Sequence, residues 1–161
     1  MHKVKVLNEF LTYTNRFCFS FAFIGIILVI SIIADGIDGF LPFTDAPNSI
    51  ATLSLKDKII EGVLYAPLFE TFLFQYLPIL IAQSYKANRQ IIIILCGLCF
   101  ALVHKYGIVY FILAFITGSI FGVAYIISQN RNESAFMNVS IIHAFYNLIA
   151  ILMNYYGLNF D

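Results

Sequence analysis

Charged residues are scarce in this chain. Only 11% of its 161 residues are Asp, Glu, Lys or Arg, while 61% are hydrophobic. A soluble globular domain carries about 25% charged residues, so this composition excludes a domain whose whole surface faces water. The formal net charge is zero. Because no basic excess is present, we expect no nucleic-acid partner. Because so few residues are charged, we expect lipid to surround the protein.

Cysteines are few as well. Cys18, Cys96 and Cys99 all lie within apolar runs, and three cysteines do not make a disulfide framework. Cys96 and Cys99 are one helical turn apart, the spacing of a redox or metal-binding pair. Such a pair needs a polar, accessible setting in which thiolates form. We therefore interpret these cysteines as small packing residues of a membrane helix.

Apolar segments separated by polar turns predict an all-α membrane protein. A spanning helix needs about 20 mostly apolar residues. The first apolar core is too long for a signal peptide and is not followed by a small-x-small cleavage site, so we expect the helix to be retained. The chain is then one integral-membrane domain, residues 1–161, forming a bundle of about five transmembrane helices. The predicted spans cover about residues 17–34, 59–83, 91–105, 108–128 and 135–156.

Local sequence signals refine these boundaries. Residues 35–54 hold clustered Gly, Pro, Asn and Asp and are predicted to form a loop. Ser54 is expected to cap the second span, with Asp57 in the place of the usual Glu or Gln of a capping box. Pro67 is expected to kink that helix. The small residues Gly118 and Gly122, four apart, predict a close approach of two helices in lipid.

The distribution of Lys and Arg predicts the orientation. Cytoplasmic loops of membrane proteins are enriched in these residues. With the N-terminus inside, six of them are cytoplasmic and three are external, so we expect a cytoplasmic N-terminus in the cell (inner) membrane. The internal group is Lys3, Lys5, Arg16, Lys86, Arg89 and Arg131, and the external group is Lys56, Lys58 and Lys105.

Three ionisable residues lie deep in the predicted spans: Glu70, His104 and His143. A carboxylate near the bilayer centre costs about 2.5–3.5 kcal/mol, so such residues are candidates for function, although a single histidine can equally be an interhelical hydrogen-bond donor. Counting about 1.5 Å per residue from the nearest polar turn puts Glu70 and His104 at one depth. His143 lies within about two helical turns of that depth.

Polar and aromatic neighbours extend this group at helical spacing. Residues four apart share one helix face, and three such pairs occur on three different spans. The pairs are Thr71 with Gln75, Phe100 with His104, and His143 with Asn147. A carboxylate, two imidazoles and an amide are suitable for activating a water molecule and for stabilising an oxyanion.

These motifs resemble those of the CPBP family, the CAAX-protease and bacteriocin-processing proteins, also called the Abi family. That family includes the eukaryotic type II CAAX prenyl endopeptidase. Its motifs occur in the same order in this chain, over about residues 60–150. They are EExxxR, here at Glu70 to Gln75; FxxxH, at Phe100 and His104; a helix bearing Phe and Gly, at Phe115, Gly118 and Gly122; and HxxxN, at His143 and Asn147.

The chain departs from the first motif. Thr71 stands where the family has its second Glu, and Gln75 stands where it has Arg. The two positions change together, which avoids leaving one buried charge without its partner. We expect a neutral hydrogen bond between Thr71 and Gln75 to take the place of an ion pair.

The resemblance implies a glutamate-type intramembrane endopeptidase that acts on a peptide or membrane-protein substrate without a cofactor. Glu70 and His104 would hold and deprotonate the attacking water. His143 and Asn147 would donate hydrogen bonds to the oxyanion, and Thr71, Gln75 and Phe100 would support the site.

Two other functions stay open at this point. Glu70, His104 and His143 also form a possible zinc ligand set, although no HExxH motif is present. A non-catalytic relative in bacteriocin self-immunity or scaffolding is the second alternative, because Thr71 and Gln75 replace charged residues. Serine and presenilin-like aspartate mechanisms are disfavoured, since the chain has neither GxSG nor GxGD, and we expect Ser119 to pack beside the glycines of its helix.

Overall fold

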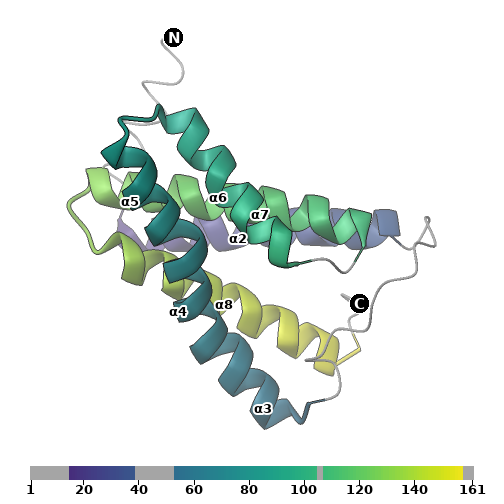
Figure 1. Ribbon diagram of the computed structural model, residues 1–161. Coiled ribbons are helices and arrows are strands. Elements are labelled where there is room, and N and C mark those ends of the chain that lie inside the picture. The colour runs from purple at the N-terminus through teal and green to yellow at the C-terminus, as the bar shows by residue number, and fades with distance from the viewer. Residues whose placement is uncertain (1–14, 39–52, 105–106, 158–161) are drawn as a thin grey trace.

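The computed structural model describes residues 15–38, 53–104 and 107–157, and this part of the chain is helical with short turns and no strand. Figure 1 shows the arrangement. The helices are α2 (Arg16–Asp38), α3 (Leu55–Ile59), η1 (Ile60–Tyr65), α4 (Ala66–Thr71), η2 (Phe72–Tyr76), α5 (Leu77–Ser84), α6 (Arg89–Val103), α7 (Ile108–Asn130) and α8 (Ala135–Tyr155).

The protein is an all-α integral membrane protein. Within the described residues, four helical segments are long and apolar enough to cross a bilayer, namely Phe17–Ile37, Leu55–Ser84, Ile108–Asn130 and Ala135–Tyr155. The predicted span at 91–105 forms a helix of only 15 residues, α6. At about 1.5 Å per residue it is about 22 Å long, less than the roughly 30 Å of a hydrocarbon core.

Two predicted boundaries change. The loop predicted for residues 35–54 begins later, because α2 continues through Asp38; residues 39–52 lie outside the described part. The third helix ends at Val103 with His104 as its C-cap, and residues 105 and 106 are not described. The predicted cap of the second span is confirmed, since the Ser54 hydroxyl accepts a hydrogen bond from the Asp57 amide.

The second span is one continuous rod, α3–η1–α4–η2–α5, which crosses α2 and α7 obliquely in Figure 1. Two π-helical turns interrupt it, and each is followed by a proline, Pro67 after η1 and Pro78 after η2. Proline has no N–H, and its ring clashes with the carbonyl four residues earlier in an α-helix. A wider π turn accommodates the ring without breaking the rod. The kink expected at Pro67 stays a prediction.

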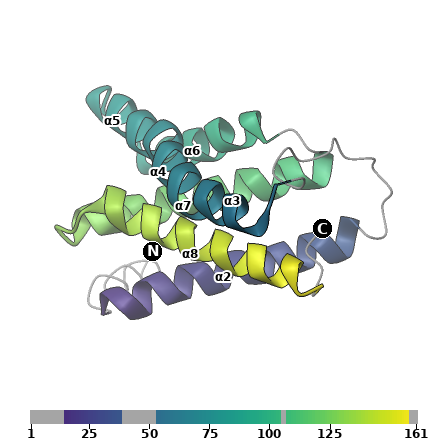
Figure 2. The ribbon, with the colours of Figure 1, turned by 90° about the horizontal axis from the view of Figure 1, so that it is seen from below.

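Helix α7 is the centre of the bundle. It packs against α6, α8 and α2, and Figure 2 shows it between α6 and the pair formed by α2 and α8. Its buried face carries Phe121, Ala124 and Tyr125. The outward faces of the other helices carry exposed Phe, Ile and Leu side chains, as expected of helices that face lipid.

The predicted close approach at Gly118 and Gly122 is confirmed between α7 and α6. A methyl group on Gly118 would meet the Phe100 Cβ at 2.5 Å and the Cys96 carbonyl at 3.0 Å. A methyl group on Gly122 would meet the Cys96 Cβ at 3.0 Å. Cys96 is fully buried in this contact, as a packing residue would be.

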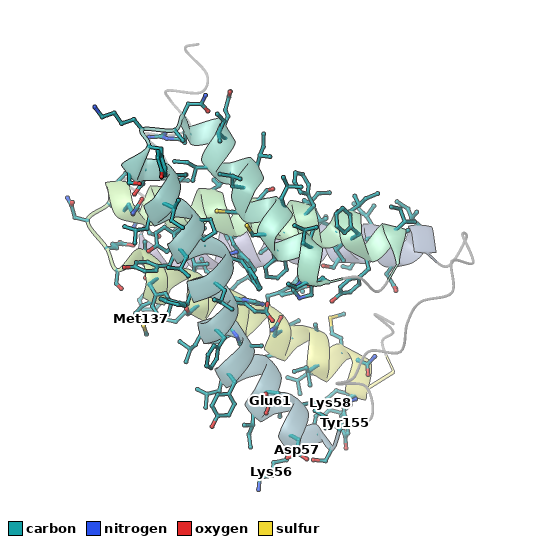
Figure 3. All side chains as sticks on the ribbon, in the orientation of Figure 1. Lys56, Asp57, Lys58, Glu61, Met137 and Tyr155 are labelled. Carbon is teal, nitrogen blue, oxygen red and sulfur yellow. The ribbon has the colours of Figure 1, made fainter. Side chains whose placement is uncertain are left out.

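The α5–α6 turn, the α7–α8 turn and the start of α2 lie at one end of the bundle. The Gln83 amide donates a hydrogen bond to Gln129 at 3.0 Å, which joins the α5–α6 turn to the α7–α8 turn. The Arg131 guanidinium lies over the Phe19 ring, 5.0 Å from its centroid, near the start of α2. Lys56 and Lys58 lie at the opposite end of the second rod, in Figure 3.

Candidate active site

Glu70, His104 and His143 meet although they come from three separate helices. The Glu70 Oε2 atom is 3.8 Å from His104 Nε2 and 3.7 Å from His143 Nε2. Glu70 lies on α4, His104 caps the C-terminus of α6, and His143 lies on α8. The Glu70 and His104 side chains keep 23% and 16% exposure, so neither is sealed inside the protein.

One contact fixes the tautomer of His104. Its Nδ1 atom lies 2.7 Å from the carbonyl oxygen of Phe100, and a carbonyl oxygen only accepts hydrogen bonds. Nδ1 must therefore carry the proton, which leaves Nε2 of the neutral ring as an acceptor. That acceptor lies 3.8 Å from the carboxylate oxygen of Glu70, another acceptor, so a donor such as water placed between them would join the two.

His143 is held in an apolar environment. Its residue is 3% exposed, and its Nδ1 atom is buried without a hydrogen-bond partner. A buried acceptor without a partner is tolerated better than a buried N–H. We therefore infer that the proton is on Nε2, directed at Glu70.

Aromatic rings set the orientation of both imidazoles. Phe100 stacks on His104 with 4.3 Å between ring centroids and meets His143 edge-on at 5.8 Å. Phe121 contacts His143 from α7 at 4.7 Å. Sequence spacing predicted a supporting role for Phe100 but gave no sign of Phe121, because its contact crosses between two helices.

Asn147 is directed at the neighbouring rod. Its side-chain amide donates a 2.7 Å hydrogen bond to the carbonyl oxygen of Gly62 in η1. The two helices approach closely here, since a methyl group on Gly62 would meet the Ile151 side chain at 2.9 Å. One amide hydrogen of Asn147 is thus used in helix packing, and the second is left for another acceptor.

The Gly62 carbonyl needs this partner because of Pro67. In η1 the hydrogen bonds run from residue i to the carbonyl of residue i−5, and the Ala66 N–H bonds to Glu61. The next donor in that register would be residue 67, which is a proline without an N–H. Gly62 is buried, so water does not replace the missing donor.

Thr71 and Gln75 do not form the hydrogen bond predicted between them. Both residues are fully buried, yet the Thr71 hydroxyl and both polar atoms of the Gln75 amide have no hydrogen-bond partner. Their spacing places them on one face of the rod, and burial in the packed interface does not bring their polar atoms together. The prediction was wrong because spacing fixes a shared face and not the rotamers.

An open groove of about 440 Å³ leads along the second rod to Glu70. The hydrogen bonds of η1 run to residue i−5, so each of its turns contains more residues than an α-helical turn. Side chains that are four residues apart therefore stay on one face of the rod. Glu61 and Tyr65 carry no motif that marks them as functional in the sequence, although they recur at this four-residue step before Phe69. The groove is lined by Glu61, Tyr65, Ala66, Phe69 and Glu70.

In the part of the chain that the structure describes, no group of three or more His, Cys, Asp or Glu residues is placed to hold a metal ion. A neutral imidazole nitrogen such as His104 Nε2 is nevertheless of the right chemistry to bind zinc.

The chain resembles known proteins at the level of a family. No curated protein and no solved structure matches the chain. A family model does match, over residues 58–149, and its description is type II CAAX prenyl endopeptidase Rce1-like. The match includes Glu70, His104, His143 and Asn147 and covers more than half of the chain. The chain therefore belongs to the Rce1-like family of type II CAAX prenyl endopeptidases.

Proposed function

We propose that the protein is a glutamate-type intramembrane endopeptidase, in which Glu70 and His104 activate the water that attacks a peptide bond. The observation that carries this proposal is the pair of facing acceptors, Glu70 Oε2 and His104 Nε2, 3.8 Å apart. A water molecule between them can donate one hydrogen to each, which aligns its lone pair with a carbonyl carbon in the groove.

The proposed reaction conserves every proton. The water oxygen bonds to the carbonyl carbon while one of its protons passes to Glu70, and the carbonyl oxygen becomes an oxyanion. The Nε2–H of His143 faces this position and donates to the oxyanion. The Glu70 proton then moves to the amide nitrogen, the C–N bond breaks, and an acid and an amine are released.

Asn147 is a less available hydrogen-bond donor to the oxyanion than His143. Its amide already donates to Gly62, so only its second N–H could serve the reaction. Its other role, closing the second rod against α8, holds Glu70 and His143 at their 3.7 Å separation. We propose that Asn147 contributes to catalysis mainly through this positioning.

We propose a peptide or protein as the substrate. The protease family and the apolar helices support a peptide or protein substrate in a lipid environment. We propose the cell (inner) membrane as the location, with the N-terminus on the cytoplasmic side, from the distribution of Lys and Arg.

Hydrolysis by the purified protein in liposomes tests the proposal. A randomised peptide mixture is incubated in ¹⁸O-labelled water, and mass spectrometry detects products whose new carboxylate contains ¹⁸O. We expect Glu70→Gln to lower this signal by about a hundredfold or more, the usual contribution of a general base. Asp57→Asn, which removes a carboxylate from the same rod outside the groove, should keep the wild-type signal.

The same assay separates the alternatives. Activity that survives prolonged chelation favours the glutamate mechanism, whereas loss on chelation and recovery with zinc favours a metal held by Glu70, His104 and His143. A wild-type protein that releases no ¹⁸O-labelled product would contradict the peptidase and favour an immunity or scaffolding role.

A further inference from the structure

The groove beside the proposed site carries a second carboxylate, Glu61. This residue is exposed, and none of the ion pairs among the described residues includes it. The groove lining contains two carboxylates, Glu61 and Glu70, and no cation. Its polar chemistry is therefore suited to a positively charged group.

Two aromatic side chains lie between the carboxylates. Tyr65 and Phe69 are 49% and 65% exposed, and both line the groove. They follow Glu61 at intervals of four residues, so the three side chains form one stripe along the rod. A cation over an aromatic face gains about 0.5–1 kcal/mol at an exposed site, and the rings also cover the aliphatic stem of a long side chain.

The stripe begins near the membrane surface. Glu61 is six residues from the start of α3, about 9 Å along the axis. Lys56, Asp57 and Lys58 surround that helix end, and Figure 3 shows Glu61 just inside them. An ionised carboxylate is stable at this depth because water and lipid headgroups reach it.

Distance relates this carboxylate to the reacting bond. Glu61 and Glu70 are nine residues apart on the rod, about 13 Å at the helical rise. An extended peptide advances about 3.3 Å per residue, so the same distance corresponds to about four substrate residues. We propose that Glu61 is a specificity-determining residue that binds a lysine or arginine of the peptide substrate about four residues from the scissile bond. This inference rests on the proposed function for its register, but the binding itself does not require catalysis.

Binding is measured first, with protein that cannot turn over. The protein carrying Glu70→Gln, in detergent micelles, is titrated with acetylated and amidated 12-residue peptides of Ala, Leu and Ser that contain one Lys. The matched peptides contain norleucine, which keeps most of the stem and lacks the charge. We expect the Lys peptides to bind about threefold to tenfold more tightly, as one exposed ion pair with a cation–π contact would give.

Variants of Glu61 then assign that preference. Glu61→Gln should reduce the Lys-to-norleucine ratio to about one, and Glu61→Lys should reverse it in favour of peptides containing Glu. Asp57→Asn is the matched control, because it removes the same charge one turn earlier and should keep the ratio. In the cleavage assay, the Lys of preferred substrates should lie three to five residues from the cut.

The two proposals fail separately. Equal binding of Lys and norleucine peptides, or a preference that Glu61→Gln leaves unchanged, overturns the assignment of Glu61 whether or not cleavage occurs. Binding that depends on Glu61, together with a wild-type protein that hydrolyses nothing, retains the cation site and refutes the peptidase.

Discussion

Replacing Asn147 by alanine tests the contact that closes the second rod against α8. The change removes the donor of the 2.7 Å bond and leaves the buried Gly62 carbonyl without a partner. An unsatisfied buried polar group costs about 1–3 kcal/mol, so the folded-to-unfolded ratio should fall by about fivefold to 150-fold. Urea or SDS denaturation in detergent micelles measures this change.

The structure also predicts how that cost can be reduced. Pro67→Ala gives residue 67 an N–H. In the π register this N–H bonds to the Gly62 carbonyl, and in an α register the Ala66 N–H does so instead. Gly62 is therefore satisfied in either case. In the Pro67→Ala background, Asn147→Ala should cost about 0.5 kcal/mol or less, a coupling of about 1–2 kcal/mol in a double-mutant cycle.

Pro78 provides the control for this cycle. It follows a π turn just as Pro67 does, but its missing N–H would have paired with Leu73, far from Asn147. Pro78→Ala and Asn147→Ala should therefore be additive within about 0.5 kcal/mol. A coupling near zero with Pro67, or one of equal size with Pro78, would refute the reasoning that links the proline to the asparagine.

Three further predictions concern packing. Gly118→Ala should destabilise the protein by about 1–3 kcal/mol. It should also reduce hydrolysis, because the new methyl group displaces Phe100 from His104. Unchanged activity would contradict this role of Phe100. Gln75→Met should raise the denaturation midpoint, because it removes a buried amide without a partner, whereas a lower midpoint would indicate that the amide is bonded. Tyr146→Phe should cost about 0.5–1.5 kcal/mol by removing the 2.9 Å hydrogen bond to Ser31, measured by the same denaturation.

The membrane class and the helices followed from the sequence with little ambiguity. A charge content of 11% cannot cover a water-facing surface, and runs of about 20 apolar residues have few alternatives to a helix in lipid. The helix ends were accurate where a local interaction defines them, as at Ser54. They were less accurate at residue 35, because α2 continues past the first Asp through Gly36 and Ile37 to Asp38.

Part of the candidate site was also accessible from sequence. Glu70, His104 and His143 were identifiable because an ionisable side chain inside a bilayer is energetically costly and is therefore a candidate for function. Their similar depth follows from the helical rise. What sequence could not give is the direction of each side chain. Phe121 and Glu61 were missed because their positions depend on how the helices cross and on the wider turn of η1.

The sequence by itself thus determined that the protein is a membrane protein and which segments are helical. It also determined which buried polar residues are candidates for function. Only the tertiary structure decided how those residues are used. Asn147 bonds to Gly62 because a proline on another helix removes a donor there, and Thr71 and Gln75 stay apart because packing fixes their rotamers. The physical reason is that periodicity is a property of one helix, whereas partners are set by the angle and register between two.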